Sequence, residues 1–134
     1  MKKATCVLVL LSLFLHQGEL YAQNNNLELS KYISLNEKMT EHSFTVDVVG
    51  DVIQFSLRIN CDLTSGDAVI ELIDPAGKKQ GKFSVVASDS GSYQSRGKLE
   101  RNIDSPINGV WVVRIVAKSA KGNVYIRSQQ EYAK

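Results

Sequence analysis

The sequence contains few of the side chains from which proteins build disulfides, zinc sites and nucleophilic centres. It has 2 cysteines and 2 histidines in 134 residues, and one of each, Cys6 and His16, lies within the first 22 positions. Only Cys61 and His42 remain beyond them. A lone cysteine excludes a disulfide within the mature chain, and one cysteine with one histidine is too few ligands for a structural zinc site. We therefore expect packing to stabilise the fold, with Cys61 buried as a small apolar side chain.

Long apolar runs are equally scarce. The longest covers residues 7–15, follows Lys2 and Lys3, and precedes a small residue at Ala22. This layout is typical of a secretory signal peptide, and the run is short for a membrane span. We expect residues 1–22 to be a signal peptide and residues 23–134 to form one exported domain, periplasmic or extracellular, without a transmembrane segment. No cysteine stands at the cleavage point, so a lipid anchor is not expected.

The chain also lacks an excess of charge of either sign. It has 16 lysines and arginines against 14 aspartates and glutamates, and removing residues 1–22 leaves 14 against 13. A nearly neutral protein has no broad positive field of the kind that drives nucleic-acid binding. Nucleic acid is therefore not an expected partner, whereas a protein or an envelope glycan remains open.

No sustained helical periodicity occurs, and the dominant period is two. Residues 53–61 alternate apolar and polar side chains, as do residues 44–48, which is the pattern of half-buried strands. Further strands are predicted at residues 68–73, 82–87, 92–103, 110–117 and 124–129. Short strands separated by frequent turn residues favour an all-β fold: a single antiparallel β-sandwich, jelly-roll-like, with seven or eight strands.

Turn residues separate the predicted strands. The segment Asp74-Pro75-Ala76-Gly77 fits a type I turn. The segment Gly122-Asn123 suits a tight hairpin, and Ser65-Gly66-Asp67 is a further turn signal.

Two apolar features concern packing rather than turns. Trp111 shares the parity of Val113 and Ile115, and we expect it in the core with Phe55 rather than on a sugar-binding surface. Residues 110–117 are apolar on both parities except at Arg114. We expect a loop or the N-terminal segment to cover the second apolar face, with an exposed patch for a partner as the alternative.

Three segments together resemble a known family. They are residues 68–77, which end in Asp-Pro-Ala-Gly, residues 108–116 with Gly109-Val110-Trp111, and residues 121–126 around Gly122. This order is similar to that of bacterial pre-peptidase C-terminal domains and the related proprotein-convertase P-domains. The resemblance implies a β-sandwich accessory module without catalytic activity. No peptidase sequence accompanies the motifs in these 134 residues, and the calcium ligands of such families cannot be matched here.

Candidate chemistry is weakly marked. Cys61 and His42 are the only thiol and base available for a nucleophilic pair. Asp47 with Asp51, and Asp62 with Asp67, are the nearest calcium candidates but lack a recognised loop spacing. Glu71 and Glu100 are scattered acids of the type that glycosidases pair. We expect no catalytic residue, no metal and no cofactor, and whether calcium binds stays open.

The ligand and the oligomeric state are not specified by the sequence. Tyr93 lies in the polar stretch 88–98, where an exposed aromatic side chain could bind a ligand. Our first hypothesis is a secreted, non-enzymatic binding or interaction module that engages its partner through loops or one sheet face. A carbohydrate-binding module that uses Tyr93 is the alternative, and a hydrolase of unmarked type is the third reading.

Overall fold

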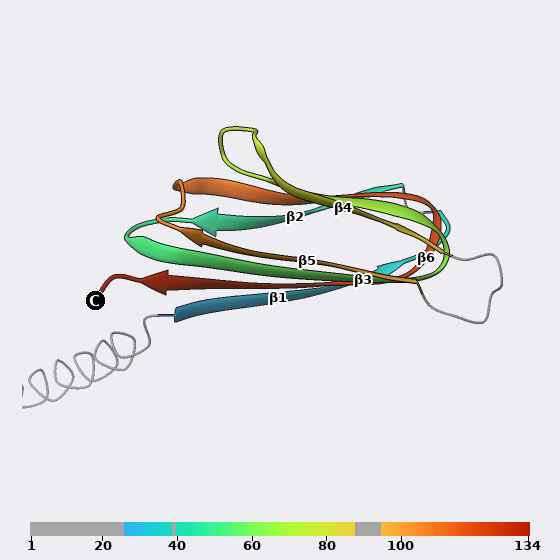
Figure 1. Ribbon diagram of the computed structural model, residues 1–134, viewed down its shortest axis with the longest axis horizontal. Helices are drawn as coiled ribbons and strands as arrows, with labels where there is room; N and C mark the ends of the chain where they lie inside the picture. Colours follow the sequence, from blue (N-terminus) through green and yellow to red (C-terminus); the bar gives the residue numbers. More distant parts are fainter. Residues whose placement is uncertain (1–25, 39, 88–94) are drawn as a thin grey trace, which may run out of the picture.

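The computed structural model describes residues 26–38, 40–87 and 95–134, and every regular element in them is a β-strand (Figure 1). The strands are β1 (Asn26–Leu35), β2 (Glu41–Val48), β3 (Val52–Ile73), β4 (Lys79–Val86), β5 (Ser95–Asp104) and β6 (Gly109–Tyr132). This part of the chain contains no helix long and apolar enough to cross a membrane. The predicted signal peptide, residues 1–22, lies outside the described residues and stays a prediction.

The long strands β3 and β6 pair with each other antiparallel and run through both layers of the molecule (Figure 1). The first half of β3 and the second half of β6 form sheet I, with β5 beside β3 and β1 beside β6. The other halves of β3 and β6 form sheet II, with β4 beside β3 and β2 beside β6. Six strands thus supply eight strand segments, and the predicted all-β, antiparallel, jelly-roll-like sandwich is confirmed.

The chain passes from one sheet to the other at bends, where sequence reasoning placed turns. Within β3 the pairing shifts register between Leu63 and Asp67, and Gly66 adopts a φ of 75°. A Cβ atom on Gly66 would collide with the backbone oxygen of Ser119 on β6. The hairpin predicted at Gly122-Asn123 is wrong, because β6 continues through these residues. Glycine marks a need for unusual backbone angles, and a bend that changes sheets satisfies that need as well as a reversal does.

The turn predicted at Asp74 to Gly77 is confirmed and joins β3 to β4. The Gly77 amide donates to the Asp74 carbonyl at 2.9 Å, and Asp74 Oδ1 accepts from the amides of Ala76 and Lys78, each at 2.9 Å. Gln80 Nε2 donates to Asp74 Oδ2 at 2.9 Å. The Gln80 amide, followed by the Lys78 backbone, holds the pKa of Asp74 below its ordinary value.

The core lies between the inner faces of the two sheets. Phe55 on sheet I and Trp111 on sheet II are 0% and 2% exposed, and their rings meet edge to face with centroids 5.2 Å apart. Trp111 Nε1 donates to the Ile107 carbonyl at 3.0 Å, which satisfies its polar atom. The predicted core role of Trp111 is confirmed, and so is the burial of Cys61, which is 0% exposed.

The alternation predicted for residues 53–61 fails at its first residue, and apolar side chains at the start of β1 are exposed. Ile53 is 46% exposed and Val52 is buried instead, because the β3–β6 pairing shifts register between Val52 and Gln54. Such a shift exchanges the two faces of a strand. Leu27 and Leu29 are also exposed, although they share the parity of buried Ile33. They lie at the start of an edge strand that pairs with β6 alone.

Candidate functional site

The outer face of sheet I carries polar side chains wherever its four strands lie side by side. Alternate residues of a strand point to opposite faces, so the residues between the core positions point outward here. The register aligns them in four rows: Glu28, Gln129, Ser56 and Asn102; Ser30, Arg127, Arg58 and Glu100; Tyr32, Tyr125, Asn60 and Lys98; Ser34, Asn123, Asp62 and Arg96. We call this surface the polar face.

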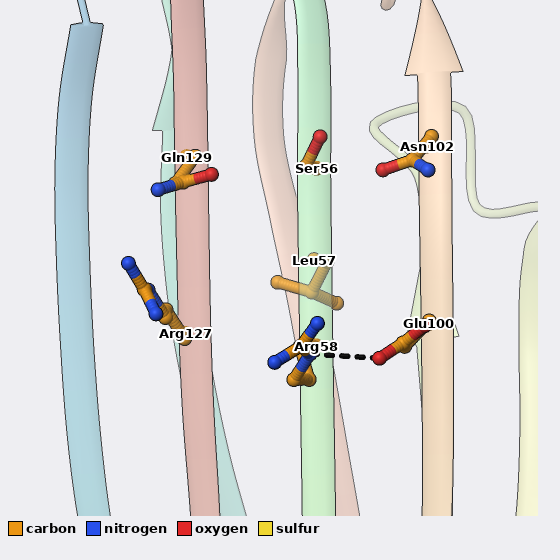
Figure 2. Close-up of a pocket in the computed structure, with 7 residues that line it drawn as sticks. All are labelled: Ser56, Leu57, Arg58, Glu100, Asn102, Arg127 and Gln129. Atoms are coloured by element: carbon orange, nitrogen blue, oxygen red, sulfur yellow. Dashed lines mark ion pairs between the residues drawn. The ribbon is translucent and has the colours of Figure 1, made fainter.

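Two hollows lie on the polar face, one further along the strands than the other. The first has a volume of about 220 Å³ and is shown in Figure 2. Its lining comes from three neighbouring strands: Ser56, Leu57, Arg58, Glu100, Asn102, Arg127 and Gln129. The second has a volume of about 480 Å³ and is lined by Asn60, Asp62, Arg96, Gly97, Lys98 and Tyr125. Together they extend over about 20 Å of strand, at about 3.3 Å per residue.

Glutamates hold the two central arginines in place from opposite sides. Arg58 Nε lies 2.8 Å from Glu100 Oε1 on β5, and Arg127 Nε lies 2.8 Å from Glu28 Oε1 on β1. Lys98 Nζ also contacts Glu100 Oε1 at 2.8 Å. These ion pairs are exposed and add little to stability. Their effect is to restrict where the guanidinium groups lie.

The glutamates remain ionised at neutral pH. The Arg127 guanidinium, followed by the Gln129 amide, holds the pKa of Glu28 below its ordinary value. The Lys98 ammonium, with Arg58 adding to it, lowers the pKa of Glu100 in the same way. The polar face therefore presents fixed positive and negative groups side by side.

Aromatic rings adjoin the charged row. Tyr32 and Tyr125 are directly opposite each other on β1 and β6, and they are 62% and 38% exposed. Tyr125 lines the second hollow, and its hydroxyl lies 3.5 Å from Ser30 Oγ. A tyrosine on a rigid strand offers a flat apolar surface with a polar tip, which suits a ligand that is itself part apolar and part polar.

The outer face of sheet II differs in composition. Its outward positions on β3 and β6 include Val69, Ile73, Val110, Val112 and Val116. Val110 and Val116 are 48% and 38% exposed, so the described residues do not provide the loop or N-terminal segment that was expected to cover this face. The first described segment, β1, lies in sheet I instead. We call this surface the valine face.

The structure separates Cys61 and His42, the only thiol and base that were available for a nucleophilic pair. Cys61 is opposite Val124 in sheet I, whereas His42 is opposite Ile115 in sheet II. Burial, and then the Asp62 carboxylate, raises the pKa of the Cys61 thiol to about 11. A buried thiol with a raised pKa supplies little thiolate near neutral pH.

The acidic candidates are also apart. Glu71 lies on the valine face, 3.5 Å from Lys79 Nζ, and Glu100 lies on the polar face. No group of three or more histidine, cysteine, aspartate or glutamate side chains able to hold a metal ion occurs in residues 26–38, 40–87 and 95–134. Tyr93, the predicted ligand-binding residue, lies outside the described residues.

Sequence reasoning allowed binding through loops or one sheet face but did not identify the polar face, because its one named candidate, Tyr93, lies in the polar stretch 88–98. Ser56, Arg58 and Asn60 are polar positions in the alternating pattern of residues 53–61. Such positions usually face solvent and do not by themselves indicate a site. Only the strand register shows that four such halves meet on one surface and that Arg58 is opposite Arg127.

No family model matches the sequence, and no curated protein matches it significantly. The structure is similar to Bacillus licheniformis lipase BlEst2 in its propeptide form, with 15% identity, a TM-score of 0.49, and coverage of 81% of this chain and 22% of the lipase. It is similar to dimeric latent PorU from Porphyromonas gingivalis, with 10% identity, a TM-score of 0.49, and coverage of 81% and 13%.

A further similar structure is described as CBM4, with 7% identity, a TM-score of 0.39, and coverage of 72% of this chain and 66% of that one. This chain thus spans less than a quarter of the lipase and of PorU. At these values the comparisons assign neither a family nor a function to this chain. The pre-peptidase and P-domain resemblance stays a prediction.

Proposed function

We propose that this protein is a non-enzymatic binding module, exported from the cell, which engages an envelope glycan along the polar face. The observation that supports the proposal is the alignment of outward polar side chains on four adjacent strands, with two hollows along them. Hydrogen-bonding groups held on a sheet are already ordered, so a ligand that needs many of them binds without a large cost in entropy.

A glycan fits this surface better than a protein partner does. The centre of a protein interface is usually apolar, with aromatic or aliphatic anchors in well-packed pockets. The centre of the polar face instead holds Arg58, Arg127 and Ser56, and its aromatic rings, Tyr32 and Tyr125, lie one row away. A chain of sugars offers many hydroxyl groups and flat ring faces, which match amide, hydroxyl and guanidinium groups beside tyrosine.

The non-enzymatic part of the proposal is supported by the separation of the candidate catalytic groups. Cys61 is buried in sheet I and His42 lies in sheet II. Glu71 and Glu100 lie on opposite outer surfaces, so they do not form the carboxylate pair that glycoside hydrolysis requires.

Affinity electrophoresis with a panel of soluble polysaccharides tests the proposal. We expect at least one polysaccharide to retard the protein. Tyr125→Ala should raise the dissociation constant obtained from the retardation about tenfold, because the ring contact is lost. Val110→Ala, on the valine face, is the matched control and should leave the constant unchanged. Trp111 is buried, so its fluorescence is a poor reporter and a direct binding measurement is needed.

The proposal fails if none of the polysaccharides retards the protein. It also fails if Val110→Ala abolishes retardation while Tyr125→Ala has no effect, because the ligand would then occupy the other sheet.

A further inference from the structure

We propose that the glycan bound by the polar face is anionic, and that an isolated carboxylate or sulfate group on it is bound between Arg58 and Arg127. This inference rests on the proposed function and specifies the chemical class of its ligand. It follows from the placement of the two guanidinium groups and of the carboxylates that hold them.

Arg58 and Arg127 are direct partners on neighbouring strands, and both point to the same side of the sheet (Figure 2). Like charges directly opposite each other on a sheet are destabilising. Here the pair stands at the middle of the polar face, with one strand beyond each arginine. The repulsion between Arg58 and Arg127 lowers stability, and the two residues line a hollow, so we infer that they are there for binding rather than for folding.

The counterions do not lie between the arginines. Glu100 is on the far side of Arg58, as Figure 2 shows, and Glu28 is on β1, beyond Arg127. Both glutamates contact Nε. An arginine carries five N–H donors, so each guanidinium has more donors than the Nε contact with its glutamate uses. The remaining donors can bind a further acceptor.

A carboxylate or a sulfate is the group that satisfies two such donors. Arginine carries donors only, in a planar fork that matches the oxygen atoms of these anions. Ser56 and Gln129 occupy the adjoining row and line the same hollow, with Asn102 on the third strand. These neutral groups are suited to the hydroxyl groups of the sugar ring that bears the anion.

Glu28 and Glu100 limit the density of negative charge that the site accepts. Both stay ionised, and they flank the arginine pair on either side. A densely charged polyanion would place neighbouring anionic groups against these carboxylates and would be repelled. A glycan whose negative groups are separated by neutral sugars avoids this repulsion, so the site selects a sparsely charged chain.

Isothermal titration calorimetry with hyaluronan oligosaccharides tests the inference, because every second sugar of this chain carries a carboxylate. The comparison ligand is the same oligosaccharide after reduction of its carboxyl groups to alcohols. We expect the carboxylate form to bind about 10- to 100-fold more tightly, as for hydrogen bonds to charged groups. A sulfated oligosaccharide with the same spacing of charge tests the second anion.

The double substitution Arg58→Gln with Arg127→Gln should remove this preference. Arg114→Gln is the matched control, because Arg114 also lies on β6 and its Nε is 3.0 Å from Glu41 Oε1, but on the valine face. It should leave both affinities unchanged. Thermal unfolding checks the double variant, which should unfold within a few degrees of the parent since exposed ion pairs contribute little.

The outcomes separate the inference from the proposed function. If the two forms bind equally and the double variant changes neither, the anion inference is overturned while glycan binding stands. If no oligosaccharide or polysaccharide binds, the proposed function itself fails. If poly-glutamate binds in an arginine-dependent way and no glycan does, the partner is an acidic protein segment and the assignment to a sugar chain is wrong.

Discussion

The polar face and the valine face are built by the same two strands and differ in how charge is arranged on them. On the valine face, Arg114 of β6 is opposite Glu71 of β3, so these cross-strand neighbours have opposite charges, while the ion pair of Arg114 is with Glu41 on β2. On the polar face, Arg127 of β6 is opposite Arg58 of β3, and compensation comes from the outer strands. The strand β6 thus carries two arginines that differ in their cross-strand neighbour. Arg114 has a glutamate opposite it on β3, whereas Arg127 has another arginine.

The two faces also differ in the types of side chain that they carry. Valine and isoleucine favour a strand for reasons of conformation and packing, so the valine face is what strand formation alone would select. The polar face replaces them with serine, asparagine, glutamine and arginine, which contribute less to the sheet. A polar outer face is ordinary for a solvated antiparallel sheet, and the proposed function adds a ligand that this face binds.

The largest expected effect concerns the bend that separates the two faces. Gly66 and Gly50 both have positive φ, at 75° and 89°, but only Gly66 lacks room for a Cβ atom. Gly66→Ala should lower the free energy of unfolding by more than the about 1–3 kcal/mol that backbone strain alone costs. Gly50→Ala should cost the strain alone. Equal losses in urea unfolding of the two variants would contradict the role given to the Gly66–Ser119 approach.

A smaller effect distinguishes the carboxylates of the two faces. Glu71 is 8% exposed, and its Oε2 is buried without a hydrogen-bond partner. Glu71→Leu should leave the free energy of unfolding unchanged or raise it by up to about 1 kcal/mol, because Lys79 and Lys82 can return to water. Glu100→Leu on the polar face should instead lower it slightly, since two exposed ion pairs are lost. If both variants shift the midpoint of thermal unfolding in the same direction, the two carboxylates do not differ in this way.

The smallest effect is the pH dependence due to Asp74, at the end of sheet II. Its folded-state pKa is lowered from an ordinary value of 3.8, so the stabilisation is complete above that value and is lost as pH falls through the lower, folded-state pKa. Asp74→Asn should therefore reduce stability at pH 7 and flatten the decline of stability below about pH 4. Acid unfolding monitored by circular dichroism measures both. An unchanged acid limb in the variant would show that other carboxylates, such as Glu28 and Glu100, account for the decline.

The sequence was sufficient for the fold class and much of the core, because strand alternation is local. It identified Phe55, Cys61 and Trp111 as buried and Asp74 to Gly77 as a turn. It was insufficient at Gly122, where a glycine that bends a strand looks the same as one that reverses it. It was also insufficient at Ile53, where an irregularity in pairing exchanges the faces.

The candidate site was not predictable in the same way. Arg58 and Arg127 are 69 positions apart in the sequence, and each looks like an ordinary solvent-facing residue of its own strand. Their proximity depends on the register between β3 and β6, which is set by packing over the whole length of both strands. The proposed function depends on the strand pairing rather than on any local motif.

Arginine side-chain NMR during a titration with hyaluronan oligosaccharides tests the central claim most directly. Arg58, Arg127 and Arg114 each have an Nε–H group beside a glutamate, at 2.8 Å, 2.8 Å and 3.0 Å. Binding along the polar face predicts that the Nε–Hε resonances of Arg58 and Arg127 shift in step with the ligand while that of Arg114 stays in place. Movement of Arg114 alone, with Arg58 and Arg127 unaffected, would contradict the account.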